Sequence, residues 1–281
     1  MFEKSSDIYG EFSIRKSSVA AEFSVVMGAY NSEETIVSSL ESLFLSSNPN
    51  VEVVIINDGS IDGTLQEIIK YAESYPSQFT IVDQANIGLT KSLNRGIDLA
   101  SGQFIVRQDA DDFSYANRMA ELRKALFNAD FVMSQADVLS VDKKFIKKST
   151  RSYYYKNGIE SLKLIFGNPF VHGTFAFRKS IYGKVKYDED FKFSQDYDFL
   201  LQVLRLGLRV NFIEQSLYAF VKNTKSISAT RRNEQSEIAK RILVKHGLTD
   251  RFYLSNKLGI KKLAYIAVRE FVILFGIKLK V

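Results

Sequence analysis

The chain has 281 residues, of which 46% are hydrophobic and 25% charged, as in an ordinary globular protein and unlike a disordered or polytopic membrane chain. It contains no cysteine, which excludes disulfides, thiolate metal sites and a cysteine nucleophile and agrees with a reducing compartment. The length allows one large α/β domain with a smaller addition, or two modest domains.

The net charge of +6 is unevenly distributed. Residues 221–281 hold 14 Lys and Arg against 4 Asp and Glu, a local balance of +10. Such a basic end suits nucleic acid, an acidic polymer or an anionic membrane surface. Nucleic acid is disfavoured, because basic and aromatic residues are not interleaved there as base stacking requires. Residues 1–22 contain no apolar run of signal-peptide length, so we expect a cytoplasmic protein.

Short apolar runs alternate with amphipathic stretches from Phe23 to Asp109, which is typical of βαβ units and a mainly parallel sheet. The pattern predicts strands at 23–30, 51–58, 79–84 and 103–109, with helices at about 32–47, 65–72 and 89–100. Asn31 and Glu34 have the spacing of a capping box for the first helix. Ligands bind at the carboxyl ends of strands in such sheets, so the polar clusters that end three of these strands are candidate sites.

After Ala129 the pattern is less regular. We expect strands or a hairpin over 130–141 and 143–148, part of a helix over 161–166, and a strand over 172–179. Helical spacing continues at 196–207, where Gly207 is the stop. Two further strands are predicted at 209–214 and 216–221, followed by a helix at 233–246.

The sequence QDADD, residues 108–112, follows the fourth predicted strand. Three carboxylates within four residues repel one another unless a cation neutralises them. Mg²⁺ or Mn²⁺ fits, because these ions take oxygen ligands and bridge carboxylates to substrate phosphates. The alternative is that these acids cap the next helix and solvate a loop.

Two other polar clusters are predicted at the same edge of the sheet. Asn57, Asp58, Gly59 and Ser60 end the second strand, where a carboxylate can accept an N–H from a nucleotide base; an ordinary β-turn is the alternative. Tyr30 ends the first strand and offers an aromatic face, although a tyrosine there is more often simple packing. Segment 86–102 opens with Gly88 before a helix whose free N–H groups could face phosphate, and it supplies further polar candidates: Lys91, Asn94 and Arg95.

Taken in order, four motifs resemble those of the family 2 glycosyltransferases with the GT-A fold: SVVMGAYNSEETI, VVIINDGSIDGT, NIGLTKSLNRGIDLASGQFIVRQDADD and FSQDYDFLLQVLRLG. The resemblance covers residues 23–220. It implies a Rossmann-like, mainly parallel central sheet flanked by helices. The chain departs from the family at residues 27–29, where many members have a proline and a threonine.

The resemblance also implies the roles of individual residues. Asp58 would bind uracil with Tyr30 stacked on it, Asp109 and Asp111 would be the metal and donor-ribose carboxylates, and Asp196 would be the general base. Asp198 is the alternative base. The donor-binding set is completed by Asn31, Asn86, Gly88, Lys91 and Ala110. His172 is a candidate ligand of the metal or the diphosphate, although a lone histidine at a strand start is more often structural.

The implied activity is metal-dependent transfer of a sugar, with inversion, from a UDP-sugar to a hydroxyl of a glycan or lipid-linked acceptor in bacterial surface polysaccharide synthesis (capsule, O-antigen or LPS). The cofactor is expected to be Mn²⁺ or Mg²⁺. The alternatives are a non-catalytic nucleotide-sugar-binding scaffold, or a nucleotidyltransferase, for which the Gly-rich lysine loop is missing. A dehydrogenase is disfavoured because no GxGxxG follows the first strand.

We divide the chain into an extension at 1–22, a GT-A domain at 23–220 and a basic helical extension at 221–281. The domain comprises a nucleotide-binding part (23–112) and an acceptor-side part (113–220). The apolar-rich positions 263–277 are too few and too charged for a membrane span, which needs roughly 20 apolar residues. We expect an interfacial helix that holds the enzyme peripherally on the cytoplasmic face of the inner membrane, or a core-packing or homodimerising helix.

Overall fold

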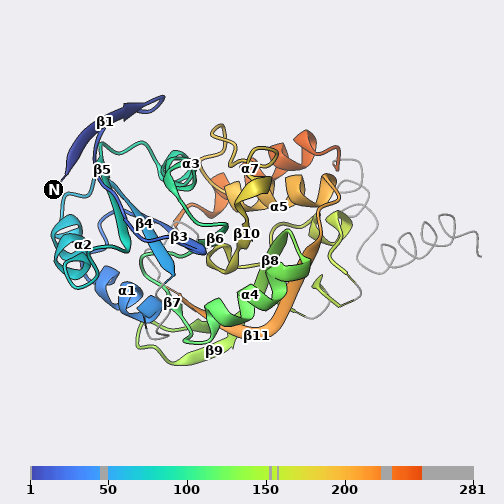
Figure 1. The fold of residues 1–281 in the computed structure, drawn as a ribbon. Helices are drawn as coiled ribbons and strands as arrows, with labels where there is room; N and C mark the ends of the chain where they lie inside the picture. Colours follow the sequence, from blue (N-terminus) through green and yellow to red (C-terminus); the bar gives the residue numbers. More distant parts are fainter. Residues whose placement is uncertain (1, 45–49, 152–153, 157, 223–229, 249–281) are drawn as a thin grey trace, which may run out of the picture.

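The computed structural model describes residues 2–44, 50–151, 154–156, 158–222 and 230–248 (Figure 1). Within them, 11 strands form a single sheet in the order β1-β2-β5-β4-β3-β6-β10-β8-β11-β7, and β9 pairs with β8. The four central strands of the first half are mutually parallel, as the alternating pattern predicts: β3 (Phe23–Ala29), β4 (Val51–Asp58), β5 (Phe79–Gln84) and β6 (Phe104–Arg107).

Helices α1 (Ile36–Phe44), α2 (Thr64–Ala72) and α3 (Leu89–Leu99) connect these strands. The prediction of a capping box at Asn31 and Glu34 is wrong. Helix α1 begins only at Ile36, and Asn31 has a left-handed backbone with φ of 49°. The side-chain oxygen of Asn31 instead accepts a hydrogen bond from the Ile61 amide, so a contact between loops replaces the local cap.

The first residues form a hairpin that the sequence pattern did not predict. Strands β1 (Glu3–Asp7) and β2 (Gly10–Arg15) are antiparallel, and β2 pairs with β5, which extends the central sheet at its edge (Figure 1). All five residues of β1 are exposed, so no alternation of apolar and polar residues marks this strand.

The second half continues the sheet with mixed strand directions. Its elements are β7 (Phe113–Ser114), α4 (Arg118–Asn128), β8 (Phe131–Leu139), β9 (Phe145–Lys148), η2 (Ser161–Leu164), η3 (His172–Thr174), β10 (Ala176–Arg178), η4 (Lys179–Ile181), α5 (Gln195–Arg205), β11 (Val210–Val221) and α7 (Arg232–Lys245). The predicted hairpin formed by β8 and β9 is confirmed, as is the helix near 233–246.

Three sequence expectations in this half need correction. The two strands expected at 209–214 and 216–221 are one strand, β11, because register shifts at Ser216 absorb the polar interruption. Residues 172–174 form a 3₁₀ turn, so the strand expected at 172–179 shortens to β10. Residues 161–164 are also a 3₁₀ turn rather than part of an α-helix.

Two apolar clusters cover the two faces of the sheet, since successive strand residues point to opposite sides. Val25, Val53 and Ile55 pack with α1, α2 and α4, whereas Val26 and Val54 pack with α3, α5 and α7. The doubly wound α/β architecture leaves the carboxyl ends of β3, β4 and β6 at one edge.

None of the helices in the described ranges is long and apolar enough to cross a membrane. The terminal segment for which an interfacial or packing helix is expected, 256–281, lies outside those ranges.

Candidate active site

The loops after β3 and β4 are held together at the carboxyl edge of the sheet. The Asn31 amide donates to Ser60 Oγ at 3.1 Å, and the Ile61 amide donates to Asn31 Oδ1 at 3.0 Å. The Ser32 amide adds a bond of 2.7 Å to Thr64 Oγ1. Asn31 thus acts first as a connector between the two loops, and Tyr30 beside it remains 52% exposed.

Asp58 lies buried at the end of β4. Its Oδ1 accepts hydrogen bonds from Gln84 Nε2 at 2.8 Å and the Ile87 amide at 2.9 Å, and its Oδ2 accepts one from the Gly88 amide at 2.9 Å. Because these donors fix both oxygens, the carboxylate has a defined orientation in the protein alone.

Glycines allow the close approach around Asp58. Gly59 has φ of +72°, and a Cβ there would lie 2.6 Å from the Asn86 nitrogen. Gly88 also has a positive φ, +89°, at the start of α3. Asn86 Nδ2 donates to the Asp58 carbonyl at 2.9 Å. Predicted donor residues Asp58, Asn86 and Gly88 are therefore brought together.

The polar candidates on α3 divide into two groups. Lys91 lies half-buried in the first turn of the helix. Asn94 and Arg95 are buried and do not face this edge. Asn94 Nδ2 donates to the Tyr187 carbonyl at 2.9 Å, and Arg95 Nε donates to Asp7 Oδ2 at 2.7 Å. Both side chains hold other parts of the fold in place, so neither is available as a polar group at the candidate site.

The acidic loop after β6 contains carboxylates with different environments. Asp109 pairs with the buried guanidinium of Arg107, and its amide donates to Tyr218 Oη at 3.1 Å. Asp112 is buried and accepts hydrogen bonds from Tyr218 Oη at 2.9 Å and from the Val221 amide at 2.8 Å. Asp112 thereby attaches β11 to the acidic loop, and Ala110 is buried between the acids.

Asp111 and Asp112 are both acids whose ionised form is disfavoured, and burial with the charges of Asp109 and Asp111 holds the pKa of Asp112 well above its usual value. Burial, and next the negative charge of Asp109, raise the pKa of Asp111 to about 6, whereas the charge of Arg107 opposes this shift. A cation near Asp111 would favour its ionised form.

Asp196 lies in the first turn of α5, after Ser194 in the left-handed region. Its Oδ2 accepts a hydrogen bond from Asn168 Nδ2 at 2.7 Å. Burial raises the pKa of Asp196, and the charge of Asp109 adds to the shift. The charge of Asp109 reaches Asp196, so helix α5 lies on the same side of the molecule as the acidic loop.

Asp198, the alternative base, has a structural position. It is fully buried and bonded to Lys245 Nζ at 2.8 Å, His246 Nε2 at 2.8 Å and Gln202 Nε2 at 2.6 Å. Burial would raise the pKa of Asp198, but the bonds from His246 and Lys245 lower it below the usual value. The residue joins α7 to α5, and these partners favour Asp196 over Asp198 as the candidate base.

His172 is not gathered with the acids. Its Nε2 lies 2.7 Å from Tyr187 Oη, and its ring meets the edges of Phe175 and Tyr187. Burial, and next the charge of Arg107, hold the pKa of His172 well below its usual value, which keeps the imidazole neutral. Across the described ranges, no group of three or more His, Cys, Asp or Glu side chains is arranged to hold a metal ion. The set Asp109, Asp111 and His172 is thus not assembled by the protein alone.

A buried arginine pair supports the acidic loop, and the sequence analysis missed its role. Arg118 is buried: its Nη1 donates to Gln108 Oε1 at 2.8 Å and its Nη2 to the Gly173 carbonyl at 2.6 Å. It also lies over the Tyr218 ring. The only sequence signal was Arg107, a charged residue at the end of an apolar strand.

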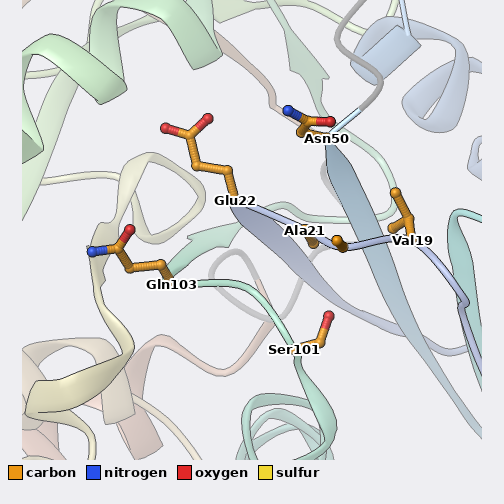
Figure 2. Close-up of a pocket in the computed structure, with 7 residues that line it drawn as sticks. Val19, Ala21, Glu22, Asn50, Ser101 and Gln103 are labelled. Carbon is orange, nitrogen blue, oxygen red and sulfur yellow. The ribbon is translucent and has the colours of Figure 1, made fainter.

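Two surface hollows are lined by none of Asp58, Asp109, Asp111 and Asp196. Figure 2 shows one of about 460 Å³ at the amino ends of β3 and β4, lined by Val19, Ala20, Ala21, Glu22, Asn50, Ser101 and Gln103. It faces the edge opposite to the candidate site and contains none of its residues. Another, of about 630 Å³, lies beside the β1–β2 hairpin and includes Gln84, which donates to Asp58.

The mostly parallel central sheet, with polar loops gathered at its carboxyl edge and helices on both faces, is an α/β architecture of the GT-A type. The sequence profile described as glycosyl transferase family 2 matches residues 24–185. The chain belongs to this family and is a glycosyltransferase. An uncharacterized glycosyltransferase of Haemophilus influenzae is 29% identical over 251 residues, which cover 84% of this chain and 75% of that protein.

Solved structures share the fold. S. aureus TarS residues 1–349, crystallised with UDP-GlcNAc, superposes with a TM-score of 0.65 at 21% identity, covering 79% of this chain and 66% of that chain. The mannosyltransferase PcManGT of Pyrobaculum calidifontis, in complex with GDP-Man and Mn²⁺, gives a TM-score of 0.58 at 20% identity, covering 83% and 66%. The expected GT-A architecture is confirmed.

Proposed function

We propose that the protein transfers a sugar from a UDP-sugar to a hydroxyl of a glycan or lipid-linked acceptor, with inversion at the anomeric carbon and with a divalent metal ion. The carrying observation is the arrangement at the carboxyl edge of the sheet, where Gln84, Ile87 and Gly88 hold Asp58 in place and the acidic loop follows β6. The charge of Asp109 in that loop also acts on Asp196, which comes from the other half of the chain.

Asp58 is the proposed recognition group for the base. A carboxylate has about four acceptor sites, and three are used by Gln84, Ile87 and Gly88, so one remains for an N–H of uracil. The half-exposed ring of Tyr30 lies on the neighbouring loop and provides a surface for stacking. The S. aureus TarS structure with UDP-GlcNAc supports the choice of a UDP-sugar.

Asp111, with Asp109, is the proposed metal ligand. Burial and neighbouring negative charge raise the pKa of both Asp111 and Asp112, but both oxygens of Asp112 already accept hydrogen bonds from Tyr218 and Val221. Asp109 is already paired with Arg107. Mn²⁺ or Mg²⁺ typically takes one or two carboxylates, water and substrate phosphate oxygens, so a set of three protein ligands is not required. Such an ion would supply Lewis-acid stabilisation of the departing diphosphate. The Pyrobaculum structure with Mn²⁺ supports this assignment.

Asp196 is the proposed general base. Asn168 Nδ2 donates to Oδ2, and the backbone amides of Asp196 and Tyr197 also bond the carboxylate, which leaves one of its about four acceptor sites for the acceptor hydroxyl. The carboxylate removes the hydroxyl proton while the oxygen attacks the anomeric carbon and the bond to the diphosphate breaks. A base with a pKa above that of an ordinary aspartate is better matched to this proton transfer. Inversion requires this base across the sugar from the diphosphate.

The acceptor and the location of the enzyme are the finer parts of the proposal. We infer a role in bacterial surface polysaccharide synthesis at the cytoplasmic face of the membrane from the family resemblance and from the basic residues after Val221. As an alternative to membrane association, the terminal segment 256–281 would form a homodimer contact.

A screen of nucleotide sugars with and without Mn²⁺, read by thermal stabilisation and slow donor hydrolysis, tests the proposal. We expect stabilisation by UDP-sugars that requires metal and is lost in Asp111→Ala. Asp142→Ala, at an exposed acid, is the matched control and should respond like the wild type. Absence of any nucleotide response would contradict the proposal and favour a non-catalytic scaffold.

A further inference from the structure

The tip of the β8–β9 hairpin exposes an unusual set of side chains. Every residue from 141 to 148 is exposed. Three of them are apolar, Val141 at 65%, Phe145 at 59% and Ile146 at 50% exposure. Four are lysines, at positions 143, 144, 147 and 148, and the only acid is Asp142. We name residues 141–148 the basic arm.

Strand β9 pairs with β8 and lies off the main strand order of the sheet. All four residues of β9 are exposed to solvent. Neighbouring strand residues point to opposite faces, so Phe145 and Ile146 present apolar groups on both sides of the arm. The turn also holds Lys143 at φ of 59°, a conformation that is costly for a residue with a Cβ. Core packing explains none of these features.

The arm lies beside the acidic loop. Lys143 Nζ is 4.6 Å from the centre of the Phe113 ring, and Phe113 directly follows Asp112. Lys148 pairs with Asp137 on β8, which fixes the base of the arm. In Figure 1, β9 lies at the periphery of the molecule near β7. A surface that contacts the arm would therefore lie next to the candidate active site.

We propose that the basic arm docks on an anionic lipid surface. Its apolar side chains would enter the interfacial layer while the lysine stems run along it and keep their ammonium groups at the headgroups. Lysines near an anionic bilayer are attracted to it, which matches four lysines beside one acid. A second copy of the arm is disfavoured by like charge, and a nucleic acid would leave Val141 and Ile146 in water.

The absence of native cysteine allows a position-specific test on the full chain. Ile146→Cys and, as a control, Phe127→Cys would each carry an environment-sensitive fluorophore; Phe127 is 78% exposed on α4. We expect a blue shift at position 146 with phosphatidylglycerol-containing vesicles, no shift with pure phosphatidylcholine vesicles, and none at position 127. A label at 146 that stays in water while the protein sediments with vesicles would overturn the proposal, since another segment would then bind.

Charge reversal provides a second measurement. We expect the double variant K144E/K147E to partition onto anionic vesicles at least about 25-fold more weakly, because each lysine contributes about fivefold. K70E/K124E changes the same net charge at exposed sites on α2 and α4 and should bind as the wild type does. Equal binding of both variants, a shift of the 146 label with heparin but not with vesicles, or no wild-type binding to anionic vesicles would each refute lipid docking. Unchanged thermal melts exclude misfolding as the cause.

Discussion

Two aspartates in the first turn of α5 have opposite pKa shifts because their side chains meet different partners. Asp196 and Asp198 are two positions apart, so their side chains leave the helix in different directions. Asp196 accepts a hydrogen bond from Asn168, and burial raises its pKa. Asp198 is bonded to Lys245, His246 and Gln202, which lower its pKa. The charged and polar partners of each carboxylate, rather than the residue type, distinguish Asp196, the proposed base, from Asp198, which links α5 to α7.

The largest expected effect is on turnover. We predict that Asp196→Asn lowers kcat by about 10² to 10⁴, because the amide cannot remove a proton. Donor binding, measured by thermal stabilisation with UDP-sugar and Mn²⁺, should persist. Unchanged turnover would remove Asp196 from the role of base.

The same substitution at Asp198 should reduce stability rather than turnover. We predict that Asp198→Asn lowers the free energy of unfolding by about 2 to 4 kcal/mol, since His246 and Lys245 lose a buried charged partner; Lys245 is partly exposed, which limits the loss. Denaturant unfolding measures it. The folded variant should keep its kcat at low temperature, and a stable protein with abolished turnover would contradict the assignment.

A smaller effect is expected at Asn168, which we interpret as a positioning residue. Its amide donates to Asp196 and lowers the pKa of that carboxyl relative to burial alone. Asn168→Ala should therefore move the acid limb of the kcat/KM profile upward by about one pH unit. At pH well above the limb, the rates of variant and wild type should converge. A uniform loss at every pH would instead indicate a structural role.

The smallest effect concerns pH-dependent stability. The pKa of Asp198 is lower in the folded than in the unfolded state, so its contribution is present above the unfolded pKa and is lost as pH falls through the folded pKa. Unfolding free energies measured from about pH 5 downward should decline more steeply in the wild type than in Asp198→Asn. Parallel curves would show that Asp198 does not titrate with folding.

Much of the fold could be predicted because local patterns determined it. The continuous apolar runs of β3 and β4, which are buried on both faces of the sheet, and the helical spacing of α3 and α5 are visible in the sequence. The β1–β2 hairpin could not be found in this way, because β1 has no buried face. The capping box predicted at Asn31 is wrong because Asn31 Oδ1 accepts a hydrogen bond from the Ile61 amide in the next loop instead.

The candidate site was partly predictable for the same reason. Acidic clusters at strand ends indicated Asp58 and Asp111, but their environments come from distant segments. The burial of Arg118 beneath the acidic loop depends on Gly173, and the anchoring role of Asp198 depends on α7. Such long-range partners have no local signal.

The β1–β2 hairpin changes where the folding unit begins. The family profile starts at residue 24, yet Asp7 forms an ion pair with buried Arg95, and Arg95 also bonds Gln84, which orients Asp58. A chain shortened to the profile would leave the buried guanidinium of Arg95 without its counter-ion, and only Gln84 separates Arg95 from Asp58, the proposed recognition group for the base. The side chains of Asp7, Arg95 and Gln84 thus link the first strand pair to the carboxylate proposed to select the donor, although this strand pair lies outside the segment that identifies the family.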